Sequence, residues 1–515
     1  MRKIFFATLV VALLNSPLLR AQTLIDYTHY PLTAACEIPP NILIVMDNSV
    51  SMYRAAYEGS FNPERIYDGY FKPSASYAYS GGGYFYINDT GRWNGNFLNW
   101  LTMRRIDMVR KALIGGKTVA GTRNTSGVSH LIGEAAGDNG YRIVKLYADG
   151  AGLLYPLPEG LGMTPSSPVC FGLADGLIFV GSTPDPITEN VLQLAIRVVK
   201  EKLLEPDDFR NGEISGLLHS LAGRARLGLM LFNADGEGGR VANPVGDELQ
   251  NLVSTIETTP IVSWSPLAES LFEAVSYFMQ IPPAYPHTPS DYLVGSHHDP
   301  FFCETFAETI PCARSFIILI SDGESTHDQE IPQSPPNGET AHLRDYDADG
   351  HDIPLAAEEG SDFLDDIALW AHTSDLRTDA DSDGEQTITL FTVSAFGSGS
   401  SLLRDAARNG GFVDVNGNRR PDGSDEWDTS QDGLPDTYYE AGDASLLGEK
   451  LIQAAVSILS GNASLGSVTL SSQSFQDEAT VFQAFYQPSP FPSSPSAGWR
   501  GFLNALWIDA FGNIR

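Results

Sequence analysis

Residues 40–52 constrain the fold of this chain more than any other stretch. An unbroken apolar run ends in Asp47 and is followed by Ser49 and Ser51 at alternate positions. Such a run is typical of a buried parallel strand, and in open α/β sheets ligands bind where the strand becomes a loop. One carboxylate and two hydroxyl oxygens on a tight turn are the hard ligands that Mg²⁺ or Ca²⁺ prefers. The stretch therefore predicts a divalent cation site.

A plainer interpretation is that Asp47 or Ser49 caps the next helix. Two distant segments favour the cation. Ser265 stands at the start of an amphipathic helix, and residues 315–324 repeat the design of an apolar strand followed by a carboxylate, Asp322. Three loops with oxygen ligands are expected at one edge of the sheet.

Charge and length narrow the class of protein. The chain has 515 residues, with 64 acidic against 32 basic side chains and a formal net charge of −32. This balance excludes nucleic acid and anionic membrane surfaces as natural partners. Bound calcium would offset part of the charge, although a soluble secreted or halotolerant surface fits the same total.

The amino terminus predicts export. Residues 1–21 combine a basic start with a short apolar run, which is typical of a secretory signal, and the run is too short for a membrane span. We expect no integral membrane segment. The four cysteines allow three pairings, and we favour Cys303 with Cys312 because they are close in sequence, which leaves Cys36 with Cys170.

Strand and helix patterns alternate over most of the chain, which predicts an α/β fold with a doubly wound, mainly parallel sheet. The expected strands are 226–232, 315–321 and 387–396, and the expected helices are 96–113, 191–204, 249–256, 265–279 and 444–459.

Acidic loops space oxygen-bearing side chains two residues apart, as calcium loops do. Two adjacent loops predict Ca²⁺ ligands at Asp414, Asn416, Asn418, Asp422 and Asp425, and at Asp428, Ser430, Asp432, Asp436 and Glu440. A third, shorter match comprises Asp345, Asp347 and Asp349, for which a solvated acidic turn is an equal alternative. For Asp379, Asp381 and Asp383 we prefer the solvated turn.

The three oxygen-bearing loops resemble the metal-ion-dependent adhesion site of von Willebrand factor A domains. In that family two serines and a threonine bind the metal directly, and two aspartates act largely through water. The resemblance implies Ser49, Ser51 and Ser265 as direct ligands of Mg²⁺ or Ca²⁺, with Ser265 in place of the usual threonine. Asp47 and Asp322 would support them.

Several segments in series resemble the amino-terminal half of the PilY1 or PilC family of type IV pilus biogenesis factors and tip adhesins. They are residues 93–107, 265–271 and 360–368, the Asn-Gly-Asn and Asp-Gly-Leu-Pro-Asp loops, and a closing Trp-x-Gly-x-Leu at 499–503. With the signal peptide at 1–21, we expect a von Willebrand factor A-like domain at 22–460, with insertions at about 53–95, 117–190, 323–385 and 411–442. Residues 461–515 would form a β-rich tail that begins a truncated further domain, without the family's β-propeller.

The resemblance implies a metal-dependent adhesin or biogenesis factor rather than an enzyme. It would be exported to the cell surface, the pilus tip or the outer membrane. Its partners would be pilus subunits or minor pilins, and a host or surface ligand with an exposed carboxylate. Two alternatives stay open at this stage: a secreted metallohydrolase that uses the same metal loop, and a structural surface module with an empty metal site.

Overall fold

The computed structural model divides into two compact units, residues 38–462 and residues 463–515 with 1–37, and each is described by itself. The structure describes residues 39–508 except 124–126, 137–140, 148–168, 182, 184, 190–191, 286–297, 304–307, 312, 324, 351–358, 378–383, 398, 462–464, 471–478 and 489–498. For residues 147, 303, 308 and 460–508 only the backbone is described.

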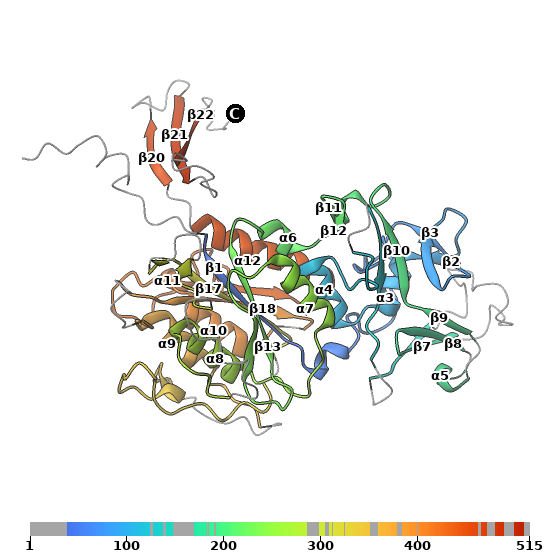
Figure 1. Ribbon diagram of the computed structural model, residues 1–515, viewed down its shortest axis with the longest axis horizontal. Coiled ribbons are helices and arrows are strands. Elements are labelled where there is room, and N and C mark those ends of the chain that lie inside the picture. The colour runs from blue at the N-terminus through green and yellow to red at the C-terminus, as the bar shows by residue number, and fades with distance from the viewer. Residues whose placement is uncertain are drawn as a thin grey trace, which may run out of the picture. The chain divides into compact units, whose positions relative to one another are not determined.

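A six-stranded sheet forms the centre of the larger unit (Figure 1). Its order is β14 (Gly239–Asn243), β13 (Arg226–Phe232), β1 (Asn41–Met46), β17 (Ser315–Ser321), β18 (Ile388–Ala395) and β19 (Tyr438–Ala441). All neighbours are parallel except β14, which runs antiparallel to β13 at the edge. In sequence order the strands read 3-2-1-4-5-6, the arrangement of a doubly wound sheet. The predicted α/β class is confirmed.

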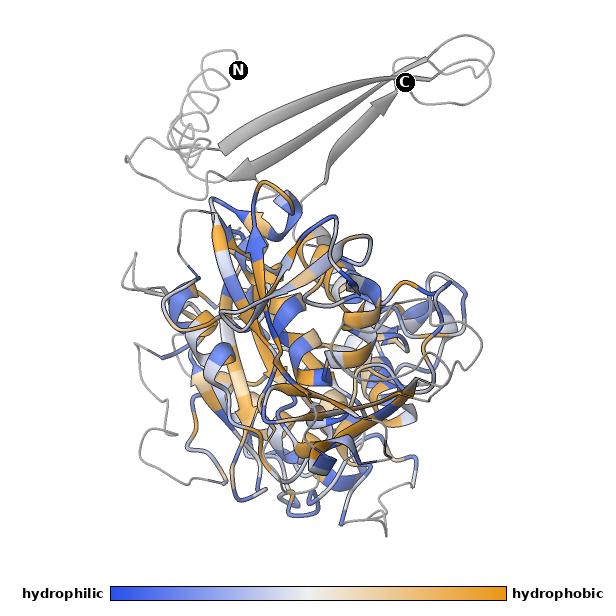
Figure 2. Ribbon diagram, turned by 90° about the vertical axis from the view of Figure 1, so that its right-hand side faces the viewer, coloured by the Kyte–Doolittle hydropathy of each residue, from blue (hydrophilic) through white to orange (hydrophobic). Residues whose placement is uncertain are grey.

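Alternate residues of β1 face two separate hydrophobic clusters, because successive side chains of a strand point to opposite faces. Ile42 and Ile44 belong to one cluster, and Leu43 and Val45 belong to the other. The first face is covered by α4 (Arg105–Ile114), α6 (Leu217–Leu221), α7 (Leu249–Thr258) and α12 (Leu447–Gly461), and the second by α8 (Leu267–Met279), α9 (Leu364–Thr373) and α10 (Ser401–Gly411). In Figure 2 the hydrophobic colour is concentrated on strands of the larger unit.

Two smaller sheets follow the short helix η1 (Val50–Tyr53). One has five strands in the order β4 (Trp93–Asn94), β2 (Ser76–Ser80), β3 (Tyr84–Ile87), β10 (Arg197–Glu201) and β5 (Val128–Ile132). The other has four strands in the order β6 (Ile143–Tyr147), β7 (Val169–Ala174), β8 (Leu177–Gly181) and β9 (Leu192–Ala195). Helix α3 (Gly95–Thr102) lies between β4 and α4 in the chain.

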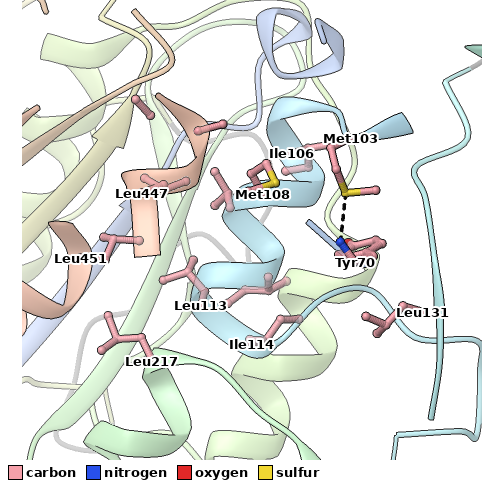
Figure 3. Packing of buried hydrophobic residues seen from close by; sticks show 14 of the residues in the cluster. Tyr70, Met103, Ile106, Met108, Leu113, Ile114, Leu131, Leu217, Leu447 and Leu451 are labelled. Carbon is pink, nitrogen blue, oxygen red and sulfur yellow. Dashed lines mark hydrogen bonds between the residues drawn. The ribbon is translucent and has the colours of Figure 1, made fainter. Parts of the chain in front are cut away.

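The single helix predicted at 96–113 is two helices, α3 and α4. The chain is extended at Met103, which ends α3, and at Arg104, which precedes α4. The Met103 sulfur accepts a hydrogen bond from the Tyr70 amide at 3.4 Å, while Leu113 on α4 packs near Leu217 and Leu451 (Figure 3). The break separates α3, which follows β4 of the five-stranded sheet, from α4, which packs on the central sheet.

The helix predicted at 191–204 is wrong, because β9 and β10 occupy this segment. Its apolar residues also alternate, and β10 pairs antiparallel with β5 over Arg197–Glu201. The β-branched pair Val198 and Val199 favours that pairing over a helix. The other strands and helices predicted on the central sheet are confirmed, with shifts of a few residues at their ends.

The remaining elements are short. They are α5 (Pro186–Glu189), η2 (Pro206–Asp208), β11 (Phe209–Arg210), β12 (Glu213–Ile214), β15 (Phe302–Cys303), β16 (Glu308–Thr309), η4 (Leu343–Asp345), α11 (Ser424–Trp427) and η5 (Ala444–Leu446). In the smaller unit β20 (Leu465–Leu470), β21 (Ala479–Pro488) and β22 (Trp499–Ile508) form an antiparallel sheet. Among the described helices, none has both the length and the apolarity to cross a bilayer.

Candidate metal centre

Asp47 lies at the carboxyl end of β1 and is fully buried. One of its carboxylate oxygens accepts a hydrogen bond from the Ser49 amide at 2.8 Å, and the other accepts from the Ser321 hydroxyl at the end of β17, also at 2.8 Å. The hydroxyls of Ser49 and Ser51 lie 2.9 Å apart, and both side chains are buried. The two strand ends therefore hold this loop in one conformation.

Ser265 is brought to the same place by the turn before α8. Its amide donates to the Thr326 hydroxyl at 2.8 Å, and the Thr326 amide donates back to the Ser265 carbonyl at 3.1 Å. The preceding residues pair with the first loop, since the Val262 amide donates to the Asn48 carbonyl at 2.8 Å. Backbone hydrogen bonds thus connect the second loop to both of the others.

Asp328 caps helix α8 from the third loop. The residue at the helix N-cap, Pro266, makes no side-chain cap hydrogen bond. The Asp328 carboxylate instead accepts from the amides of Ala268 and Glu269 at 2.9 Å each, and from the Ser325 hydroxyl at 2.6 Å. Burial raises the pKa of Asp328 to about 7. This carboxylate fixes the start of α8, and with it the position of Ser265.

Asp322 follows β17 and faces an arginine. Arg105, at the start of α4, donates to one Asp322 oxygen at 2.6 Å. The other oxygen is buried without a hydrogen-bond partner. Arg105 also stacks its guanidinium over the ring of Phe396, 5.6 Å from the centroid. A buried carboxylate oxygen without a partner is costly, and a cation or its water ligands would satisfy it.

A pocket of about 420 Å³ opens at these loops. Hydroxyl and arginine side chains predominate in its lining. The lining residues are Ser49, Val50, Ser51, Tyr53, Arg54, Ala55, Tyr141, Arg142, Ile143, Ser263, Ser265 and Thr326. The three predicted hydroxyl ligands therefore line one cavity. Residues 141–143 lie at the start of β6, so the pocket joins the four-stranded sheet to the edge of the central sheet.

Arg104 supports the part of the pocket wall that Tyr53 and Tyr141 form. Its guanidinium donates to the carbonyls of Tyr53 and Tyr141, the latter at 3.0 Å. The two tyrosine rings lie 5.0 Å apart, centroid to centroid. Arg104 and Arg105 are neighbours in sequence but have different partners. Arg104 binds the carbonyls of the pocket wall, and Arg105 pairs with Asp322.

The donor set fits a hard divalent cation. Adjacent oxygens in an octahedral Mg²⁺ site, at about 2.1 Å from the metal, lie about 3 Å from one another. The 2.9 Å between the Ser49 and Ser51 hydroxyls agrees with this spacing. Burial raises the pKa of Asp47 to about 7, and the nearby charge of Asp322 adds to the shift. A bound cation would compensate the negative charges of both carboxylates, Asp47 and Asp322.

The predicted calcium loops are curled as their spacing implies. The Asp414 carboxylate accepts from the amides of Gly417 at 2.7 Å and Arg419 at 2.9 Å, and the latter bond contributes most to the lowered pKa of Asp414. The side-chain amides of Asn416 and Asn418 donate to Asp422 at 3.0 and 2.9 Å. Four of the five predicted residues thus close on one turn. Asp425 lies on α11, with its carboxylate beside Gly423.

The loop at 428–440 is curled like the loop at 414–425 over its first half. Asp428 accepts from the amides of Asp432 at 3.0 Å and Gly433 at 2.9 Å, and from the Ser430 hydroxyl at 3.3 Å. Asp436 accepts instead from Thr429. Glu440 lies on β19, and its carboxylate is close to Gly399.

The third acidic loop, at 345–349, contains more carboxylates in its neighbourhood than its sequence spacing predicts. Ligand oxygens of Asp345, Asp347 and Asp349 lie within 4.8 Å of one another. Asp366, on the first turn of α9, accepts from the Asp347 amide at 3.2 Å. Burial and neighbouring aspartates raise the pKa of Asp366 to about 7 and that of Asp365 to about 9. Sequence reasoning missed these two residues because α9 brings them in from outside the loop.

The weaker run at 379–383 and the signal segment at 1–21 lie outside the described residues. So do Cys36 and Cys312, while the side chain of Cys303 is not described. Cys170, expected to pair with Cys36, is a free and buried cysteine on β7.

Sequence reasoning also missed Arg104, Arg105, Ser321 and Thr326 as parts of the site. The paired arginines were visible only as members of a segment that resembles the PilY1 family.

The fold and the pocket define a mixed α/β protein with a candidate cation site, and a family comparison adds to this. Residues 58–151 match the family model described as "PilY1 homolog, small alpha/beta domain". The match supports a PilY1-type family for the chain, and with it a type IV pilus-related function and a surface-related location. No curated protein matches the chain. The matched segment contains Arg104, Arg105 and the wall residues 141–143 of the pocket.

Replacing Asp328 with alanine should lower the free energy of unfolding by about 1–3 kcal/mol, because two buried amides of α8 lose their acceptor. Urea denaturation followed by circular dichroism measures the change. Asp89→Ala, at an exposed position, is the matched control and should change stability by less than about 0.5 kcal/mol. Equal stability of the two variants would contradict the capping role of Asp328.

Proposed function

We propose that this chain is a type IV pilus-associated adhesin or biogenesis factor that binds a partner through a metal-ion-dependent adhesion site on a von Willebrand factor A-like domain. The strand order of the central sheet, its antiparallel edge strand β14 and the loops at the carboxyl ends of β1 and β17 support a domain of this type. The match of residues 58–151 supports the link to pili.

The observation that carries the proposal is the convergence of Ser49, Ser51 and Ser265 on one pocket, with Asp47 and Asp322 behind them. These hydroxyls would bind Mg²⁺ or Ca²⁺ directly, and the two carboxylates would hold its water ligands. The cation would keep one position open for a carboxylate of the partner, which forms a strong bond to the metal. Arg105 would leave the site less negative than two aspartates alone, which favours an anionic ligand.

We propose binding rather than turnover for this pocket. Among the described residues, its lining offers hydroxyls, tyrosines and arginines, and no histidine or lysine that could serve as a general base. The partners would be pilus subunits or minor pilins together with a surface ligand that exposes a carboxylate. The protein would act after export, at the pilus tip or the outer cell surface.

The acidic loops would hold Ca²⁺ with a structural role. Arg420 donates to the carbonyls of Tyr346, at 3.1 Å, and of Asp347, so the loops at 345–349 and 414–422 already contact one another. Asn409 donates to Asp347 at 2.9 Å and connects α10 to the same place. Calcium in these loops would stabilise this side of the sheet by coupling metal binding to folding.

Isothermal titration of the chelator-treated protein with Mg²⁺ tests the site. Ser49→Ala and Ser51→Ala each remove one proposed ligand and should weaken Mg²⁺ binding by roughly tenfold or more. Ser263→Ala is the matched control, because Ser263 lines the same pocket and is not a proposed ligand. If all three variants bind Mg²⁺ like the unaltered protein, the assigned ligand set is wrong.

Mg²⁺ binding should also depend on pH. With its pKa raised to about 7, Asp47 carries a proton in the metal-free protein at lower pH, and the metal must displace it. Apparent affinity should therefore fall by up to about tenfold per unit as the pH drops from 7 to 5, and should level off above pH 8. The same titration repeated across this range measures the effect. An affinity that does not change between pH 5 and 8 would contradict the role of Asp47.

A further inference from the structure

Arg105 supplies the positive charge beside Asp322 in the metal-free protein. Its guanidinium donates to one Asp322 oxygen at 2.6 Å, and the Arg105 and Asp322 side chains are only 8% and 3% exposed. The pair is incomplete on both sides, because the second Asp322 oxygen and the Nε of Arg105 are buried without hydrogen-bond partners. Burying two charges costs free energy that such a pair offsets only in part. A better counter-ion for Asp322 can therefore replace the guanidinium.

Glu58 offers the guanidinium a second acceptor. One Glu58 oxygen lies 3.7 Å from an Nη atom of Arg105, and the Glu58 side chain is 77% exposed. A closer approach by about 1 Å would bring these two groups to ordinary ion-pair distance. Because Glu58 is solvated, an ion pair with it is weak, and Arg105 prefers Asp322 as long as that carboxylate has no other counter-ion.

Phe396 holds the guanidinium between the two carboxylates. The Arg105 guanidinium lies 5.6 Å from the centroid of the Phe396 ring, and the Phe396 carbonyl accepts from it at 3.5 Å. Phe396 has a left-handed backbone conformation, with a φ of 65°, which is rare for a bulky residue. Residues with such strain cluster at binding sites, where the surrounding contacts maintain them. The ring and the carbonyl support the guanidinium next to both Asp322 and Glu58.

The backbone that carries Arg105 is held in place. The Arg105 amide donates to the Arg54 carbonyl at 3.1 Å. The amide of the preceding residue, Arg104, donates to the buried carboxylate of Asp107 at 3.2 Å. Because these contacts fix the first turn of α4, an exchange of partners by Arg105 needs only a rotation of its side chain.

We propose that Arg105 is a resident counter-ion, which a cation must displace from Asp322 toward Glu58, and that it thereby selects divalent over monovalent cations. This role rests on the proposed metal-dependent function. A monovalent ion carries the same charge as the guanidinium and gains nothing by displacing it. A divalent ion brings one more positive charge to Asp47 and Asp322, which offsets the loss of the ion pair. The selectivity of the site thus comes from a side chain that is not itself a ligand.

Isothermal titration of the chelator-treated full chain with Mg²⁺ tests the role of Arg105. Arg105→Gln removes the counter-ion and should tighten Mg²⁺ binding roughly tenfold or more, whereas loss of a merely structural arginine would leave the affinity unchanged or weaken it. In chelator the same variant should melt several degrees below the unaltered protein, because buried Asp322 loses its partner, and Mg²⁺ should reduce this difference. Arg224→Gln, at an exposed position, is the control and should change neither quantity.

Repeating the titration in NaCl and in choline chloride at equal ionic strength measures the selectivity. Na⁺ should compete with Mg²⁺ in Arg105→Gln and not in the unaltered protein.

Glu58→Gln removes the second acceptor and should weaken Mg²⁺ binding several-fold, without changing the melting temperature in chelator. Glu64→Gln, at another exposed glutamate, is its control. Because Glu58→Gln leaves Asp322 paired, it tests the displacement even if Arg105→Gln does not fold.

The outcomes separate the role of Arg105 from the proposed function. If Ser49→Ala weakens Mg²⁺ binding while Arg105→Gln and Glu58→Gln bind Mg²⁺ like the unaltered protein, the proposed function stands and the counter-ion role is overturned. If Ser49→Ala binds Mg²⁺ normally and Arg105→Gln still binds it more tightly, the assigned ligand set fails and the counter-ion role stands. Competition by Na⁺ in the unaltered protein would overturn the selectivity.

Discussion

The pair of carboxylates at the ends of two adjacent parallel strands is the constraint on which the rest of the site depends. Asp47 is fully buried after β1, and Asp322 after β17 lies close enough for its charge to raise the pKa of Asp47. Buried carboxylates must be paired, hydrogen-bonded or neutralised. In this chain the Ser321 hydroxyl, the Ser49 amide and the Arg105 guanidinium do part of this, and one Asp322 oxygen stays buried without a partner. That remaining cost is what a divalent cation would remove.

The same arrangement explains why the four-stranded sheet and the central sheet contribute to one site. Arg105 starts the helix that packs on the central sheet and reaches Asp322, while its neighbour Arg104 reaches back to the pocket wall at Tyr53 and Tyr141. The break between α3 and α4 places the two guanidinium groups on different sides of the chain. The backbone is extended at Arg104, and in extended backbone successive side chains point to opposite sides of the chain.

Sequence reasoning succeeded where a short segment carries its own signal. The apolar runs before Asp47 and Asp322 predicted β1 and β17, and parallel pairing then brought their carboxyl ends together. It failed where tertiary contacts decide the outcome. Residues 192–201 have the apolar content of a helix but pair as strands, and Glu440 stands at nearly the spacing of a calcium ligand but points toward Gly399 from β19. Asp365 and Asp366 join the loop at 345–349 only through the packing of α9, which no local pattern encodes.

The most direct test of the account is a crystal structure of the protein soaked in Mn²⁺, with anomalous diffraction used to locate the ion. The account predicts one peak between the hydroxyls of Ser49, Ser51 and Ser265, at about 2.1–2.2 Å from each, with Asp47 and Asp322 in contact with its water ligands. A fully occupied Mn²⁺ elsewhere, with no density among these three hydroxyls, would contradict the central claim.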